Sequence, residues 1–252
     1  MKVNIEFETG APKSIMMNDL TVFTGTDLLW EVDLSSRLAK AKRNIEGTWL
    51  PPIETNNGIC DLSIFEDTDI SKNPELTDHL TSVIDGSYVY NHDEDGTWSF
   101  HMKTGQNIWL EASGIPNFIC NLRPLYLYLK FVLTPDSQAW VSIVNPEDGL
   151  SMMKQREMAQ FIVHMVNAGY KVILMTHSCV IIDEIGLLMT LTQKRRRIKE
   201  ILASQSSGRQ NSLLDYRRVA GYGVVDRVII ERKVTRTGID FKEVDCACHN
   251  LM

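Results

Sequence analysis

The sequence predicts an α/β fold in which a mixed, mainly parallel sheet is flanked by helices and joined to an antiparallel β-rich region. Two apolar runs, residues 139–144 and 172–175, are nearly continuous, as in strands that are buried on both faces of a parallel sheet. The amphipathic segment 151–167 lies between them and predicts the right-handed crossover helix of a strand, helix, strand unit. Turn signals concentrate in residues 47–110, which predicts short antiparallel strands there.

Length and composition are those of an ordinary globular protein. At 252 residues, with 44% hydrophobic and 23% charged side chains, the chain can bury roughly 70 to 75% of its unfolded surface. We expect a single domain, with a β-rich insertion around 47–110 and a C-terminal strand hairpin around 222–244. The net charge of −6 argues against coating nucleic acid by bulk electrostatics. Five irregularly spaced cysteines, with neither a membrane-length apolar run nor a signal-peptide pattern, lead us to expect a cytoplasmic protein without membrane contact.

The N-terminal region predicts two strands and a helix. Val3, Ile5 and Phe7 alternate with polar residues, as in a half-buried strand. Residues 15–24 predict a second strand, which closes on Gly25. Apolar positions then recur at helical spacing from residue 28 to residue 45.

The middle of the chain mixes strands with short helices. Residues 87–90 and 97–102 predict strands, and residues 74–80 predict a short helix. Acidic clusters at 66–69 and 93–95 lack the spacing of a calcium loop, so we interpret them as solvated turns. An apolar helix is predicted at 118–133.

The C-terminal region predicts one long helix and a hairpin. The helix starts after Ser178 and continues into a basic stretch at 194–199, and a polar loop follows at 204–211. Residues 222–231 and 239–244, separated by Thr237 and Gly238, predict the strands of a terminal hairpin.

The central unit resembles the second half of the ATP-binding head of ABC-type ATPases, in particular the SMC-like and overcoming-lysogenization-like kind. In that family the first strand ends in an acidic pair followed by Pro-Glu, and the second ends in Thr-His-Ser. Here Pro146-Glu147 and Thr176-His177-Ser178 match. The acidic pair, which holds magnesium and polarises water in the family, is replaced by Val144 and Asn145. The resemblance implies that His177 stands where the family senses the terminal phosphate.

The opening of the chain also resembles these heads, but its phosphate loop is degenerate. Residues 20–25, reading LTVFTG, match the strand that precedes the loop. A loop of the form GxxxxGK[ST] needs glycine for close approach, lysine for charge and a hydroxyl for magnesium. Counted from Gly25, those three positions hold Trp30, Glu31 and Val32. One like-charge pair about 4 Å apart costs ~4 kcal/mol at an effective dielectric of 20, so Glu31 would repel a triphosphate. The alternative is that residues 25–33 are an ordinary helix start.

Ser113 and Gly114 stand where the family places its signature motif, before an apolar helix and between the two halves of the head. In an active dimer that motif contacts the partner's nucleotide. The alternative interpretation is a plain helix cap by Ser113.

Two further clusters suggest binding chemistry. The run Lys194, Arg195, Arg196 and Arg197 can contact DNA phosphates or an acidic protein, although the overall acidity favours a solvated helix end. Residues 246–249, reading CACH, provide only one half of a structural zinc site, so we expect no metal. A triad of Ser178, His177 and Asp183 is disfavoured because it lacks a nucleophile elbow.

The combined losses predict a pseudo-ATPase that binds no cofactor and acts by protein interaction. Leu28, Leu29 and Trp30 would fill the vacated site or form a partner surface. The resemblance implies a homo-oligomer and a phage or prophage exclusion or defence factor, whose partner is a DNA replication or repair protein. The alternative function is an active ATPase with an atypical site that couples ATP to DNA binding.

Overall fold

The computed structural model describes residues 2–5, 13–25, 34, 38, 71–91, 97–103, 109–111, 122–123, 125–134, 140–201, 213–225 and 228–241.

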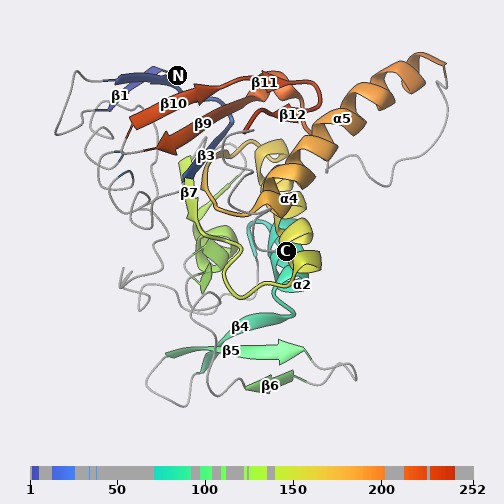
Figure 1. Ribbon diagram of the computed structural model, residues 1–252. Coiled ribbons are helices and arrows are strands. Elements are labelled where there is room, and N and C mark those ends of the chain that lie inside the picture. The colour runs from blue at the N-terminus through green and yellow to red at the C-terminus, as the bar shows by residue number, and fades with distance from the viewer. Residues whose placement is uncertain are drawn as a thin grey trace.

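A five-stranded sheet forms the centre of the molecule (Figure 1). Its order is β10-β9-β3-β8-β7, and β9, β3, β8 and β7 run parallel while β10 is antiparallel to β9. The predicted mixed, mainly parallel sheet is therefore confirmed. The strands are β3 (Leu20–Gly25), β7 (Trp140–Val144), β8 (Lys171–Met175), β9 (Val219–Val225) and β10 (Val228–Arg232).

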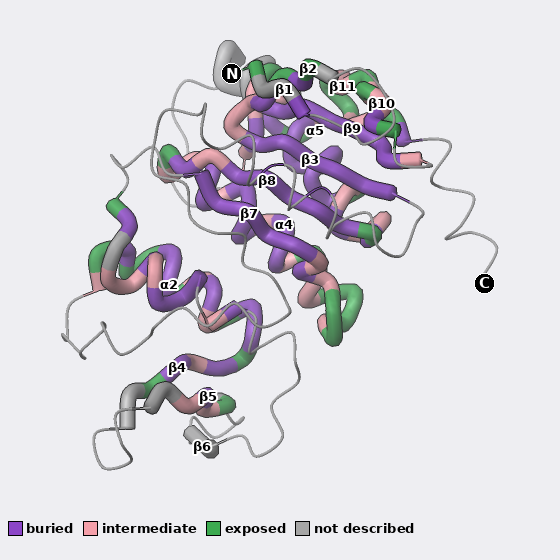
Figure 2. The backbone as a smooth tube through the Cα atoms, turned by 90° about the vertical axis from the view of Figure 1, so that its left-hand side faces the viewer, coloured by how far each residue is buried: buried purple, intermediate pink, exposed green. Residues whose placement is uncertain are grey.

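Both faces of this sheet are buried, as the apolar runs predict. Figure 2 shows β3, β7 and β8 as buried along nearly their whole length. Val22 and its neighbours pack on one face against helices α4 (Met152–Asn167) and α5 (Cys179–Ile201). Phe23 and its neighbours pack on the other face in a second cluster, to which the hairpin of β1 (Lys2–Ile5) and β2 (Lys13–Met16) contributes Ile5 and Ile15.

The crossover helix begins and ends where the sequence predicts. Ser151 caps α4, and its hydroxyl accepts a hydrogen bond from the Lys154 N–H. The apolar stripe that faces the sheet includes the buried Met158 and Ile162. Gly169 has φ of 100°, a left-handed conformation that terminates the helix before β8.

The segment 15–24 is not one strand, contrary to the prediction. It contains the end of β2, a bend and β3, and these two strands belong to different sheets. Asn18 fixes the bend, because its N–H donates to the Thr21 hydroxyl and its side-chain amide donates to the carbonyls of Arg217 and Val219. These bonds, one local and two to a distant segment, interrupt the strand without any change in the apolar pattern.

A second unit lies below the central sheet in Figure 1. The predicted short helix is confirmed as α2 (Pro74–Val83), and the predicted strands are confirmed within β4 (Gly86–Asn91) and β5 (Thr97–Lys103). With β6 (Trp109–Glu111) they form an antiparallel sheet of order β4-β5-β6.

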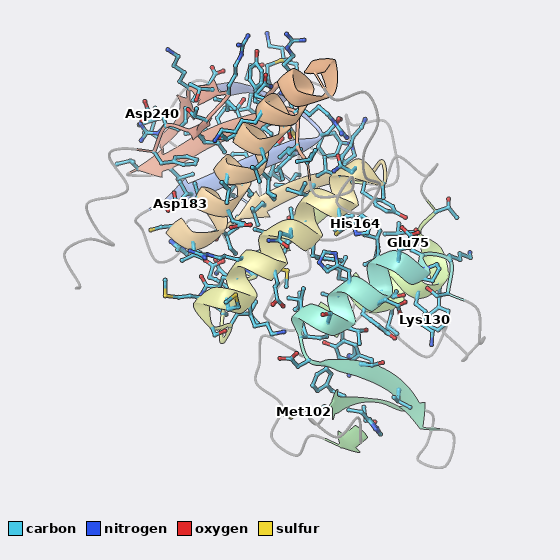
Figure 3. All side chains as sticks on the ribbon, turned by 90° about the vertical axis from the view of Figure 1, so that its right-hand side faces the viewer. Glu75, Met102, Lys130, His164, Asp183 and Asp240 are labelled. Carbon is cyan, nitrogen blue, oxygen red and sulfur yellow. The ribbon has the colours of Figure 1, made fainter. Side chains whose placement is uncertain are left out.

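Helix α2 packs against α4 through a pair of histidines. The His79 and His164 Nδ1 atoms are 3.2 Å apart, and Nε2 of His164 is 3.9 Å from a Glu75 carboxylate oxygen (Figure 3). This contact joins the second unit to the central one.

The helix predicted at 118–133 is described only in part. Residues 122–123 and 125–127 are α-helical, and η3 (Tyr128–Val132) is a π-helix. The buried Asn73 side chain donates to the carbonyls of Leu129 and Leu133, which satisfies acceptors at the end of this turn.

The predicted C-terminal hairpin is wrong in its pairing. The run 222–231 is divided between β9 and β10, which pair with each other, while Gly238–Ile239 (β12) pairs with Val234–Thr235 (β11). The reason is that β9 is a central parallel strand beside β3, so its apolar character reflects burial between neighbours.

Candidate functional site

Three parallel strands end side by side at one edge of the sheet. Strand β8 lies between β3 and β7, and Met175 at its end pairs with both Phe23 and Val144. The segments that follow these strands therefore meet at this edge, where ligands bind in open α/β sheets. The predicted site positions Gly25, Asn145 and His177 lie here.

Asn145 leaves β7 in a left-handed conformation, with φ of 47°. Asn tolerates this region better than most residues with a side chain. Its N–H donates to the Met175 carbonyl at 2.9 Å, which continues the pairing with β8 by one bond. Its side-chain oxygen is buried and has no hydrogen-bond partner within the part of the chain that the structure describes. Val144 before it is 9% exposed and packs into the second core cluster.

Glu147 ties the turn after β7 to the turn after β8. One carboxylate oxygen accepts a hydrogen bond from the Thr176 hydroxyl at 2.7 Å, and the other accepts one from the His177 N–H at 2.6 Å. Burial raises the pKa of the Glu147 carboxyl above its ordinary value, and these two hydrogen bonds oppose the shift. The carboxylate thus links the turn after β7 to the turn after β8.

His177 ties the end of β8 to the end of β3. Its Nδ1 lies 3.0 Å from the Gly25 carbonyl oxygen, so the ring donates from this nitrogen. The residue as a whole is exposed. Because Gly25 is the last residue of β3, the imidazole bridges the carboxyl ends of the neighbouring strands β3 and β8.

Ser178 starts helix α5. Its hydroxyl accepts the Ile181 N–H at 3.1 Å and donates to the Gln155 side-chain oxygen on α4 at 2.6 Å. This is a helix cap that also links two helices. The Ser178 hydroxyl thus has a hydrogen-bond partner both as donor and as acceptor.

Several predicted site residues lie outside the described residues. They are Leu28, Leu29, Trp30, Glu31, Val32, Ser113 and Gly114. The CACH segment at 246–249 lies outside as well. The basic run Lys194 to Arg197 continues helix α5, and Lys194 is exposed. Figure 1 shows this end of α5 extending away from the sheet.

Neither a metal-type cluster nor a membrane span is found in the described ranges. There, three or more His, Cys, Asp or Glu side chains never converge as they would around an ion. Each described helix is also too short or too polar to cross a bilayer.

Sequence reasoning missed the structural roles of Gln155 and Glu147. Glu147 was recognised as a family match, but nothing in its spacing shows that its carboxylate turns inward onto Thr176 and His177. Gln155 lies in the first turns of α4, and only the packing of α4 beside α5 brings it to Ser178. Only the three-dimensional pairing of the two turns provides the signal.

Comparisons with known proteins find similarity among solved structures. No protein-family model matches the chain, and no curated protein matches it. Among solved structures the chain is similar to the SMC head domain from Thermotoga maritima, with 9% identity and a TM-score of 0.47 over 92% of this chain and 98% of that chain. The strand order and connections described above establish the α/β fold by themselves.

Proposed function

We propose that this protein is an ABC-ATPase-like head that does not hydrolyse ATP and acts by binding another protein. The order of motifs along the chain supports the likeness to an ABC-ATPase head. The motifs LTVFTG, Pro146-Glu147 and Thr176-His177-Ser178 follow one another in the same order as in the family. Folding brings the ends of the same three strands to one edge, as a nucleotide site requires.

The observation that carries the proposal is the position of the Glu147 carboxylate. It is the acidic side chain nearest in sequence to the end of β7, and both of its oxygens already accept hydrogen bonds from the β8 turn. A carboxylate that holds magnesium or orients water must direct at least one oxygen toward the ligand. Glu147 instead directs both oxygens at Thr176 and His177 in the turn after β8.

The side chains at the family's catalytic positions support the same conclusion. Val144 is apolar and packed in the core, and Asn145 cannot supply the negative charge that binds magnesium. Glu31 replaces the lysine that would neutralise a triphosphate, so the charge at that position is reversed. Phosphoryl transfer depends on these electrostatic contributions, and all three are missing together.

Protein binding is favoured by exposed apolar side chains on α5. Leu187 and Leu191 are 49% and 40% exposed and four residues apart, so they lie on one helix face. Asp183 and Lys194, also exposed, flank them on that face. From the family resemblance we propose that the partner is a DNA replication or repair protein, and that the role is exclusion of a competing phage.

The nucleotide test combines hydrolysis with binding. Purified protein should release no phosphate from Mg-ATP above background. A ligand at 100 times its Kd stabilises the native state by ~2.7 kcal/mol, which raises Tm by roughly 5 to 11 °C in a chain of this size. We expect no such shift at millimolar Mg-ATP. Turnover, or a shift that disappears in His177→Ala, would instead establish the alternative of an atypical ATPase.

The partner test uses matched charge substitutions. Leu187→Glu with Leu191→Glu should abolish capture of a replication or repair protein, while Val228→Glu, at a residue 54% exposed on β10, should leave capture intact. Capture that is equally strong in both variants would reject α5 as the partner surface. DNA retention that falls steeply with salt, and that is lost when Arg195 to Arg197 are neutralised, would indicate nucleic-acid binding instead.

A further inference from the structure

A polar pocket lies at the edge of the sheet opposite to the candidate site. It has a volume of about 180 Å³ and is bordered by the bend at Asn18 and Asp19, by Trp140 and Lys171, and by Arg217 and Arg218. Trp140 and Lys171 are the first residues of β7 and β8, and both arginines precede β9. The strands that run away from this pocket end at Val144 and Met175, next to the candidate site at the opposite edge of the sheet.

Arg218 is a fixed part of the pocket wall. Its Nε donates to Asp19 at 2.7 Å, one terminal nitrogen donates to the Asn167 side chain at 3.0 Å, and the other donates to the Val166 carbonyl at 2.7 Å. Its positive charge is thereby matched by the Asp19 carboxylate. Lys171 and Arg217 supply the remaining positive charge of the lining.

Lys171 is held at the pocket by an aromatic ring. Its ammonium group lies 5.3 Å from the centre of the Trp140 ring, which is buried. A lysine whose ammonium group is already held over a fixed ring loses less freedom when it binds an anion. Among the described residues, no ion pair involves Lys171.

Arg217 is exposed and comes from a separate element, the short helix η6 (Tyr216–Arg218). Asp215 caps this helix by accepting the Arg217 N–H at 3.1 Å and is the acid beside this arginine. The negative charge of Asp215 is offset by Arg236, which lies close to Arg217. The guanidinium groups of Arg236 and Arg217 are 6.0 and 5.8 Å from the centre of the same Tyr216 ring.

Hydrogen bonds fix the two sides of the pocket relative to each other. The Asn18 amide donates to the carbonyls of Arg217 and Val219, which joins the bend before β3 to η6 and β9. The cations are therefore presented from a connected framework, and little reorganisation is needed for an anion to bind.

We propose that this pocket binds a phosphate group. Its volume is below the range of sites for drug-sized ligands, so it suits a small anion or the terminal group of a larger molecule. Arginine and lysine are the side chains that recognise phosphate oxygens. A phosphate group carries nearly two negative charges at pH 7, which matches Lys171 and Arg217 once Arg218 and Asp19 have neutralised each other.

The test measures inorganic phosphate binding by calorimetry at low ionic strength. The variants are Lys171→Met, which removes the ammonium group and keeps an unbranched side chain, and Arg217→Gln. Lys72→Met is the control, since Lys72 is exposed and stands just before α2 in the second unit. We expect saturable binding in wild type and control, and a loss of about tenfold or more in each pocket variant. Absence of saturable binding, or unchanged affinity in both pocket variants, would overturn the proposal.

Two further arms identify the source of the phosphate and separate this pocket from the strand-end edge. A 5′-phosphorylated single-stranded oligonucleotide that binds more tightly than inorganic phosphate, with the same variant losses, assigns the pocket to nucleic-acid ends; equal affinity assigns it to small phosphate compounds. ATP binding that disappears in Lys171→Met belongs to this pocket. ATP binding that persists in this variant and disappears in His177→Ala belongs to the other edge and contradicts only the proposed loss of nucleotide binding.

Discussion

Acidification should weaken the contact between α2 and α4 through its histidine pair. The Nδ1 atoms of His79 and His164 are 3.2 Å apart, so one donates a hydrogen bond and the other, which must be unprotonated, accepts it. If both rings become charged, both Nδ1 atoms carry hydrogen and the bond is replaced by repulsion. Burial lowers the pKa of both rings, and the charge of His164 lowers that of His79 further, whereas Glu157 and Glu75 act in the opposite direction.

The direction of the effect follows from these lowered pKa values. Below about pH 6.5, the ordinary value for histidine, the unfolded chain binds more protons than the folded chain. The stability contributed by the neutral pair is therefore complete above that pH and is lost as the pH falls through the lower folded values. The ring centres are 5.5 Å apart, so two charges repel by ~3 kcal/mol at an effective dielectric of 20 and by ~1 kcal/mol in water. We expect a loss of about 1 to 3 kcal/mol.

Urea denaturation between pH 7.5 and pH 5.0 measures this loss. The pKa of Glu147 is raised, so its contribution to the free energy of unfolding falls as the pH rises above the ordinary pKa of glutamate. This trend is opposite to that of the histidine pair. Histidine variants are therefore needed to isolate the effect of the pair. His79→Phe and His164→Phe should each flatten the profile by a similar amount, because either change removes the pair. The double variant should flatten it further, because burial alone still lowers the pKa of the ring that remains in each single variant. Two results would refute the reasoning. Wild-type stability does not fall on acidification, or it falls equally in the histidine variants.

Three substitutions, each assessed by urea denaturation, test other contacts. Asn73→Ala removes an amide that bridges the π-helix carbonyls and the Tyr170 hydroxyl, so we expect a loss of about 2 to 4 kcal/mol; a loss below ~1 kcal/mol contradicts this role. Gly86→Ala would place its Cβ 2.1 Å from the Phe100 ring, and overpacking should cost about 1 to 3 kcal/mol; wild-type stability would show that the ring moves freely. Tyr222→Phe removes two hydrogen bonds to the β2 backbone and should cost about 1 to 3 kcal/mol; unchanged stability contradicts this role.

Features that depend on local sequence were predictable. The apolar runs at 139–144 and 172–175 and the helical segment 151–167 follow from periodicity over a few residues, and the structure has each of them. The same reasoning failed at Asn18, because its amide is satisfied by carbonyls some 200 residues away.

The candidate site was predictable by position but not by geometry. The motif order indicated that Gly25, Asn145 and His177 mark strand ends, and the sheet brings those ends together. That His177 reaches the Gly25 carbonyl, and that Glu147 turns onto the β8 turn, depends on which strands are neighbours. The pocket at Lys171 and Arg217 was equally hidden, since its walls come from four separate segments.

The placement of β3 affects how the protein is made. This central strand has β8 on one side and β9 on the other, and β9 is translated about 200 residues after it. At 5 to 20 residues per second, roughly 10 to 40 s pass before a growing chain can complete the sheet. Until then the apolar Leu20, Val22 and Phe23 lack their permanent neighbours. A ribosome-bound nascent chain is therefore expected to depend on chaperones until its C-terminal strands emerge.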